Sequence, residues 1–226
     1  MKKKCAQKAI SMIEDGMTIG LGGGQSIAFL IKELEKSEKM ILAVTPSQDT
    51  LELCLKYRIP VRSLEMTDQI DIAFDGCDEL DENLNALKSC GGIHTREKIV
   101  AVMAKNYVLL ADEQKYHKTL SFHHPITIEV IRSARAAVKK SLKNMGASVI
   151  ERHADKKVGL VVSDDGNYLM DVRFSNSSSL DEINAKLNRI PGIVEHSLFY
   201  QIASKAIIAS ENGIQIIERK NKSEKI

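Results

Sequence analysis

The chain has 226 residues, enough to bury the core of one large domain or two modest ones. Its 32 basic and 30 acidic residues are interspersed, apart from a short basic tail after Glu218, and give a formal net charge of +2. With no basic stripe, no tryptophan, five Phe and five Tyr, the composition argues against a nucleic-acid partner.

The sequence also argues against export and against a membrane. The first residues lack the apolar stretch of a secretion signal, and no apolar run approaches the roughly 20 residues that span a bilayer. The four cysteines lie far apart with no Cys-x-x-Cys pair, so neither a metal site nor a disulfide framework is predicted. We therefore expect a cytoplasmic protein with free thiols and no membrane partner.

The first half of the chain alternates predicted helices with predicted strands. Apolar residues at helical spacing predict helices over 3–14, 27–34, 48–57 and 93–104. Short apolar runs predict strands at 17–21, 40–44, 60–64, 70–74 and 107–111. This alternation is typical of an open, mostly parallel sheet that helices cover on both faces.

The order of elements changes near residue 125. Strands are predicted at 126–131, 148–152, 159–163 and 168–174, and helices at 134–145 and 180–189. Two last strands, at 206–210 and 213–218, are expected to return to the first sheet. We therefore predict the α/β class, with a sheet domain of residues 1–124 plus 197–226 and an inserted α+β domain of residues 125–196.

The strongest chemical signal lies at residues 71–79, where an apolar strand runs into Asp75, a glycine and Asp78. Functional groups of open α/β sheets gather at the carboxyl ends of strands, so both carboxylates are expected at a crevice. Two carboxylates placed there can hold sugar hydroxyls, and one can move a proton. An ordinary Asp-Gly turn explains the same residues equally well.

A second signal runs from Lys88 through small residues into a helix that carries Glu97 in its first turn. Free backbone N–H groups and a lysine can stabilise an anion such as an enediolate oxygen. A partly desolvated carboxylate has a raised pKa, which suits proton abstraction. The alternative is a surface charge cluster of Arg96, Glu97 and Lys98.

The third signal is the glycine-rich stretch from Gly20 to Ser26, between a strand and a helix. Backbone N–H groups at such a helix start can bind a phosphate. No Gly-Lys-Ser/Thr follows, so it is not a Walker loop, and an ordinary tight turn is an equal alternative.

Together these three tracts resemble the ribose-5-phosphate isomerase A family. The likeness continues in order through residues 111–115, 125–130, 166–168 and 190–196, and so covers nearly the whole chain. The resemblance implies a Rossmann-like sheet domain with a smaller ferredoxin-like α+β domain, assembled as a homodimer or a homotetramer.

The resemblance also implies an activity: interconversion of ribose 5-phosphate and ribulose 5-phosphate in the pentose phosphate pathway, through a cis-enediolate, with no metal or organic cofactor. It implies that Glu97 moves the proton between C1 and C2, Asp75 helps to open the furanose ring, and Lys88 stabilises the enediolate. The further positions implied to bind the sugar phosphate are Asp78, Gly23, Gly24, Gln25, Ser26, Ser89, Cys90, Gly91, Lys115, and Lys2 or Lys3.

Two loops depart from the family pattern. The turn that is usually Gly-Thr-Gly-Ser-Thr has glycine at Gly23 and glutamine at Gln25, and the glycines that usually follow the lysine are replaced by Ser89 and Cys90. These changes spare the proton-transfer residues but alter the loops expected to touch the substrate. Two alternatives therefore stay open: a diverged isomerase of another small sugar phosphate, and a non-catalytic sugar-phosphate sensor on the same fold.

Overall fold

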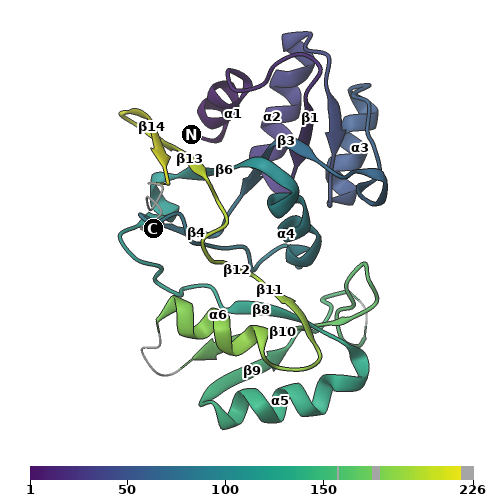
Figure 1. The fold of residues 1–226 in the computed structure, drawn as a ribbon, viewed down its shortest axis with the longest axis vertical. Helices are drawn as coiled ribbons and strands as arrows, with labels where there is room; N and C mark the ends of the chain where they lie inside the picture. The colour runs from purple at the N-terminus through teal and green to yellow at the C-terminus, as the bar shows by residue number, and fades with distance from the viewer. Residues whose placement is uncertain (157, 175–178, 220–226) are drawn as a thin grey trace, which may run out of the picture.

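The computed structural model describes residues 1–156, 158–174 and 179–219, which contain a large sheet and two smaller ones (Figure 1). The large sheet has the order β14-β13-β6-β3-β1-β2, and its strands are β1 (Thr18–Leu21), β2 (Leu42–Val44), β3 (Ile70–Gly76), β6 (Ala104–Asp112), β13 (Lys205–Ser210) and β14 (Gly213–Glu218). All neighbours in it are parallel except β13 and β14. The prediction of an open, mostly parallel sheet that the last strands rejoin is confirmed.

Helices cover both faces of this sheet because its strands alternate their apolar side chains. Along β6, Val108 and Leu110 pack with buried residues of α1 (Lys2–Ile10), α2 (Gly24–Ser37) and α3 (Gln48–Lys56). Tyr107 and Leu109, which alternate with them along the strand, pack on the other face with α4 (His94–Met103). A strand buried on both sides is what the continuous apolar run at 107–111 indicates.

The second sheet has the order β11-β8-β10-β9, with antiparallel neighbours throughout. Its strands are β8 (Ile126–Val130), β9 (Ala147–Glu151), β10 (Tyr168–Phe174) and β11 (Ile193–His196), and its helices are α5 (Arg135–Asn144) and α6 (Leu180–Asn188). Val138 of α5 and Leu187 of α6 pack with Ile128 and Met170 in one core. An antiparallel sheet with helices is the α+β arrangement predicted for this stretch.

A third, small sheet was not predicted. Its order is β12-β5-β4-β7, and its strands are β4 (Glu79–Asp81), β5 (Ala86–Leu87), β7 (Tyr116–His117) and β12 (Leu198–Phe199). Strands of two or three residues are too short to show a period in the sequence. Three 3₁₀ turns complete the described elements, at Leu64–Met66, Glu113–Lys115 and Arg132–Ala134.

Two predicted strands are wrong. Residues 60–64 make only one bridge, between Val61 and Ala43, and then turn into the 3₁₀ helix. Residues 159–163 make two isolated bridges, from Leu160 and Val162. Neither stretch has a buried residue, so no apolar face extends the pairing into a ladder.

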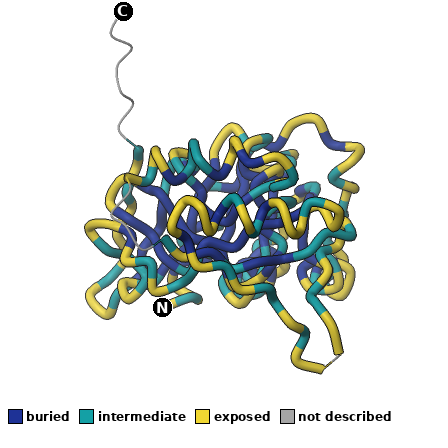
Figure 2. Tube along the Cα trace, turned by 90° about the horizontal axis from the view of Figure 1, so that it is seen from below, coloured by how far each residue is buried: buried dark blue, intermediate teal, exposed yellow. Residues whose placement is uncertain are grey.

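Buried residues run through the interior of the molecule, and exposed residues follow the outer faces of helices and the loops (Figure 2). Within the described ranges, no helix is both long enough and apolar enough to cross a membrane.

Glu79 of β4 fixes the loop that leads from the large sheet to β8. The residue is only 2% exposed. Its carboxylate accepts hydrogen bonds from the backbone N–H groups of Ser121, Phe122 and His124, at 2.8 to 3.0 Å, and from the Ser121 hydroxyl. Burial raises the pKa of Glu79, but these hydrogen bonds lower it by more, so the net shift is downward. The loop therefore depends on an ionised carboxylate.

We expect Glu79→Ala to lower the free energy of unfolding by about 2–4 kcal/mol, because it leaves several buried N–H groups without an acceptor. Urea unfolding followed by circular dichroism measures the change. The control is Glu82→Ala, which removes an exposed glutamate nearby and should have little effect. Equal losses in the two variants would contradict this role of Glu79.

Candidate active site

A pocket of about 480 Å³ opens where the carboxyl ends of β1, β2 and β3 meet. The residues after β1 provide the glycine-rich turn, and those after β2 provide the start of α3. Gly76 at the end of β3 and the two residues that follow it also line the pocket. The stretch from Lys88 into α4 closes the pocket, and Asp164 reaches it from the turn before β10. Parallel strands whose carboxyl ends share one edge create such a crevice.

Lys88, Asp75 and Glu97 form a buried charge cluster at this pocket. Lys88 Nζ lies 3.0 Å from Asp75 Oδ2 and 3.2 Å from Glu97 Oε1, and it donates a hydrogen bond of 2.6 Å to the carbonyl of Gly76. The three side chains are between 3% and 7% exposed. Lys88 and Glu97 line the pocket, and Asp75 lies behind them. Opposite charges so deeply buried interact far more strongly than they would in water.

Asp75 is held from several sides. Its Oδ1 accepts hydrogen bonds from the N–H groups of Gly76 at 2.8 Å and Gly23 at 3.3 Å, and the Tyr107 hydroxyl donates to its Oδ2 at 3.4 Å. Gly22 allows the close approach, because a Cβ added there would lie 2.0 Å from Asp75 Oδ1. The glycine-rich turn therefore also makes room for a carboxylate.

The cluster shifts the pKa of each member. The pKa of Glu97 is raised to about 8, because burial and the nearby Asp75 together outweigh the lowering effect of Lys88. Burial likewise raises the pKa of Asp75 against the opposing effect of Lys88. Burial lowers the pKa of Lys88, but Asp75 and Glu97 raise it by more. Lys88 therefore stays charged, while Glu97 can gain and lose a proton near neutral pH.

The neighbours of Glu97 in α4 are held by the second sheet and its loops. The Thr95 hydroxyl donates to the buried Glu129 of β8. The guanidinium of Arg96 pairs with Asp165, with a shortest distance of 2.6 Å. Lys98 Nζ lies 2.7 Å from Glu195 Oε1 and donates to two carbonyls of the 196–198 segment. These contacts on both sides of Glu97 fix its direction, and α4 lies beside β11 and β12 in Figure 1.

Asp78 lies at the mouth of the pocket and is held by the loop after Lys88. Its Oδ2 accepts hydrogen bonds from the N–H groups of Ser89 at 2.6 Å and Cys90 at 2.9 Å. The Ser89 hydroxyl is buried and contacts the carbonyl of Pro125 and the hydroxyl of Ser197. Ser89 was predicted to bind substrate. In the structure its backbone N–H orients Asp78, and the Ser89 side chain points away from the pocket. Burial and Asp78 both raise the pKa of Cys90, so its thiol is not activated as a nucleophile.

The other end of the pocket has the character of an anion site. Helix α2 begins at Gly24, whose φ of +81° favours glycine, and Gly23 makes no side-chain cap. The first N–H groups of α2 are therefore free to bind a negative charge. Lys2 Nζ donates to Gln25 Oε1 at 2.6 Å and brings a cation to the same end. Lys3 is exposed and does not line the pocket, so the structure favours Lys2 of the two predicted lysines.

Most of the predicted positions meet at the pocket. Those that line it are Lys2, Gly23, Gly24, Gln25, Ser26, Asp78, Lys88, Cys90, Gly91, Glu97 and Lys115. Lys115 also donates a hydrogen bond of 2.6 Å to the carbonyl of Cys77.

The sequence reasoning missed other lining residues: Ser47, Gln48, Asp49, Gly76, Cys77, Ile93 and Asp164. Ser47 caps α3 by accepting from the N–H of Thr50, and a serine directly before a helix that follows a strand is a signal that could have identified this segment. Asp164 comes from a distant turn, and no local pattern points to it.

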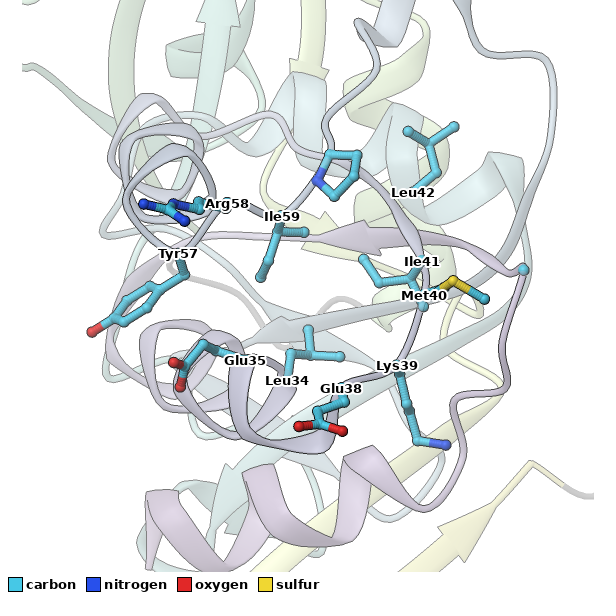
Figure 3. A pocket seen from close by; sticks show the side chains of 12 residues that line it. Leu34, Glu35, Glu38, Lys39, Met40, Ile41, Leu42, Tyr57, Arg58 and Ile59 are labelled. Atoms are coloured by element: carbon cyan, nitrogen blue, oxygen red, sulfur yellow. The ribbon is translucent and has the colours of Figure 1, made fainter.

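A second hollow, of about 540 Å³, lies at the opposite edge of the large sheet (Figure 3). It is bounded by the ends of α2 and α3 and by residues that precede β1 and β2. Leu34, Ile41 and Ile59 line it together with Tyr57 and a few charged side chains, among them Arg58. This hollow lies at the amino ends of the strands of the large sheet, whereas ligands of open α/β sheets bind at the carboxyl ends. Its lining residues also include no lysine paired with two carboxylates, so we do not favour it as the catalytic site.

Known proteins are similar to this chain over nearly its whole length. The family model of ribose 5-phosphate isomerase A (phosphoriboisomerase A) matches residues 42–213. The chain belongs to this family. Ribose-5-phosphate isomerase A of Methanocaldococcus jannaschii is 38% identical over 97% of this chain and 98% of its own length, and that of Pyrococcus horikoshii is 37% identical over the same shares.

Solved structures of the family have the same fold. The M. jannaschii isomerase superposes with a TM-score of 0.89 at 37% identity and covers 96% of this chain and 97% of its own. A D-ribose-5-phosphate isomerase in complex with phospho-erythronic acid has a TM-score of 0.91 at 36% identity, with the same coverage. The family resemblance and the α/β fold class predicted from the sequence are thereby confirmed.

We expect Gly22→Ala to reduce kcat/KM by roughly 10²-fold, because the added Cβ displaces Asp75 and with it Lys88. Gly23→Ala, whose Cβ would meet nothing closer than 3.4 Å, should lose much less activity. Isomerase assays, together with melting curves that confirm folding, measure both. A larger loss in Gly23→Ala would contradict the close approach of Gly22 to Asp75.

Proposed function

We propose that this protein is an aldose–ketose isomerase that interconverts ribose 5-phosphate and ribulose 5-phosphate. The observation that carries the proposal is Glu97, a buried carboxylate that opens on the pocket, lies 3.2 Å from Lys88 and has a pKa of about 8. A general base works best when its pKa lies near the operating pH. Membership in the isomerase family supports the same reaction.

Glu97 acts as the group that moves the proton. Its carboxylate takes the proton from C2 of the open-chain aldose, and the electron pair of that bond forms the C1–C2 double bond and leaves the charge on O1. The O2 hydroxyl proton then moves to O1, C2 becomes the carbonyl carbon, and Glu97 returns its proton to C1. The ammonium of Lys88 is the cation that stabilises the charged enediolate oxygen.

Asp75 was predicted to help to open the furanose ring. It lies behind Lys88, outside the lining of the pocket, and this position supports a further role in holding the Lys88 ammonium in place. Ring opening by Asp75 stays a prediction.

The two ends of the pocket suit the two ends of a sugar phosphate. The start of α2 with Lys2, Gln25 and Ser26 offers N–H groups, a hydroxyl and a positive charge for the phosphate. Asp78 offers a carboxylate for sugar hydroxyls beside Glu97. The relative that holds phospho-erythronic acid supports a phosphorylated acyclic ligand for this family.

The alternatives of another small sugar phosphate or a non-catalytic sensor are less well supported. Relatives similar over nearly the full chain are named isomerases. A sensor also has little need of a carboxylate whose pKa suits proton transfer. If the protein binds a different sugar phosphate, Gln25 is the lining residue that would change the specificity.

We further propose a homodimer or homotetramer in the cytoplasm, with residues 1–124 plus 197–226 as one domain and 125–196 as the other. The free state of all four cysteines supports a reducing compartment. The pairing of β13 with β6 supports placing the last segment with the first. The family resemblance supports the assembly.

We expect Glu97→Gln to lower kcat by roughly 10²–10⁴-fold while KM changes little, because the amide keeps the shape but cannot accept the proton. The measurement is isomerisation of ribose 5-phosphate with EDTA present. The control is Glu52→Gln on the exposed face of α3. Full turnover in Glu97→Gln would refute the assignment, and a folded wild-type protein without turnover would favour another ligand.

We expect kcat/KM to rise with pH and level off above the pKa of Glu97, which is raised to about 8. Glu97 must be ionised to accept the proton, so each pH unit below that value should cost about tenfold. Initial rates between about pH 6 and 9 at low substrate measure the profile. A profile that is flat over this range would contradict the raised pKa of Glu97.

A further inference from the structure

Three side chains with different metal-binding atoms meet beside the active site. Asp78 follows β3, Cys90 lies in the loop after Lys88, and His124 lies just before β8. A carboxylate oxygen, the thiol sulfur and a ring nitrogen of these residues all lie within 4.8 Å of one another. The three are far apart in the sequence, so no spacing pattern predicts this cluster.

An ion can reach the cluster from solvent without unfolding the protein. Asp78 and Cys90 line the active-site pocket, Cys90 is exposed, and the side chain of His124 is 39% exposed. Exposed side chains can rotate by the small amount that brings three ligand atoms to metal-binding distance. The cluster is therefore both open and adjustable.

Neighbouring groups already orient two of the ligands. The N–H groups of Ser89 and Cys90 hold Asp78 through Oδ2, so the carboxylate can offer Oδ1. Nδ1 of His124 lies 3.3 Å from Oε1 of the buried Glu79. This contact holds the imidazole ring of His124 in place, and such carboxylate–histidine contacts commonly orient metal ligands.

The donor set selects the class of ion. Oxygen, nitrogen and sulfur donors together suit zinc, which accepts all three, whereas magnesium and calcium favour oxygen alone. Three protein ligands leave a fourth position for water or another oxygen ligand, as in open zinc sites. Binding changes no oxidation state: the Cys90 sulfur forms its bond to zinc and releases its proton to solvent.

We propose that Asp78, Cys90 and His124 form a site for a thiophilic divalent cation, zinc above all, and that the bound ion excludes the sugar phosphate. The exclusion follows from position, because the ion occupies the pocket mouth and engages Asp78, the carboxylate assigned to sugar hydroxyls. The exclusion rests on the proposed function, whereas the binding of zinc does not.

The binding experiment is calorimetric titration of zinc into the full-length protein, freed of metal and kept reduced by a phosphine. We expect one zinc per chain, with release of a proton that appears as a dependence on the buffer's ionisation enthalpy. Cys90→Ser and His124→Asn should each weaken binding about tenfold or more. His123→Asn, which changes the exposed histidine next in the chain, is the matched control and should bind as the wild type does.

Cobalt provides a second measurement on the same proteins. Cobalt bound by Cys90 should show the near-ultraviolet charge-transfer absorption of a cobalt–thiolate bond, and Cys90→Ser should lose it while its melting curve stays cooperative. Absence of zinc binding, or binding that neither Cys90→Ser nor His124→Asn weakens, would overturn the site.

The competition is tested by adding ribose 5-phosphate to the titration and zinc to the isomerase assay. We expect the sugar phosphate to weaken zinc binding and zinc to raise the apparent KM, with each variant compared with its own rate in EDTA. Zinc binding that ribose 5-phosphate does not weaken would overturn the exclusion. If the protein binds zinc but does not turn over ribose 5-phosphate, the proposed isomerase function is contradicted and the proposed zinc site is supported.

Discussion

The contacts of Lys88 with Asp75 and Glu97 are the constraint on which the active site depends. An ammonium this deeply buried is stable only beside compensating negative charge, and two carboxylates this close to each other are stable only with a cation between them. One lysine shared between two carboxylates leaves one negative charge in excess. Burial, together with this excess negative charge, raises the pKa of Glu97 to about 8, which suits a group that moves protons.

The rest of the fold brings these three side chains together. The close approach of Gly22 lets β1 and β3 place Asp75 beneath the glycine-rich turn, and the stretch before α4 brings Lys88 over it. Contacts from the second sheet to Thr95, Arg96 and Lys98 hold the helix turn that carries Glu97. The second sheet and its loops therefore contribute to the site mainly by holding α4, and among the described residues of 125–196 only Asp164 lines the pocket itself.

Two of the residues that depart from the family pattern, Gln25 and Cys90, lie at the rim of the pocket rather than in the charge cluster, whereas Ser89 is buried. Gln25 accepts a hydrogen bond from Lys2, and the backbone N–H of Cys90 donates to Asp78. Rim residues with exposed neighbours can change without leaving a buried charge unpaired, whereas a change at Lys88, Asp75 or Glu97 cannot. This difference explains how the loops around the pocket can change while the buried charge cluster stays intact.

The sequence by itself determined the alternation of strands and helices and the strand end at Asp75, because period and turn chemistry are local properties. The candidate base Glu97 came from the resemblance to the isomerase family, since the local pattern also allowed a surface charge cluster. It mispredicted strands at 60–64 and 159–163, since pairing depends on a partner surface that local sequence does not reveal. Only the tertiary structure decided that Lys2 rather than Lys3 lines the pocket, that Ser89 faces the interior, and that Asp78, Cys90 and His124 meet. These are distances between residues remote in the chain, and they are set by how the sheets and helices pack.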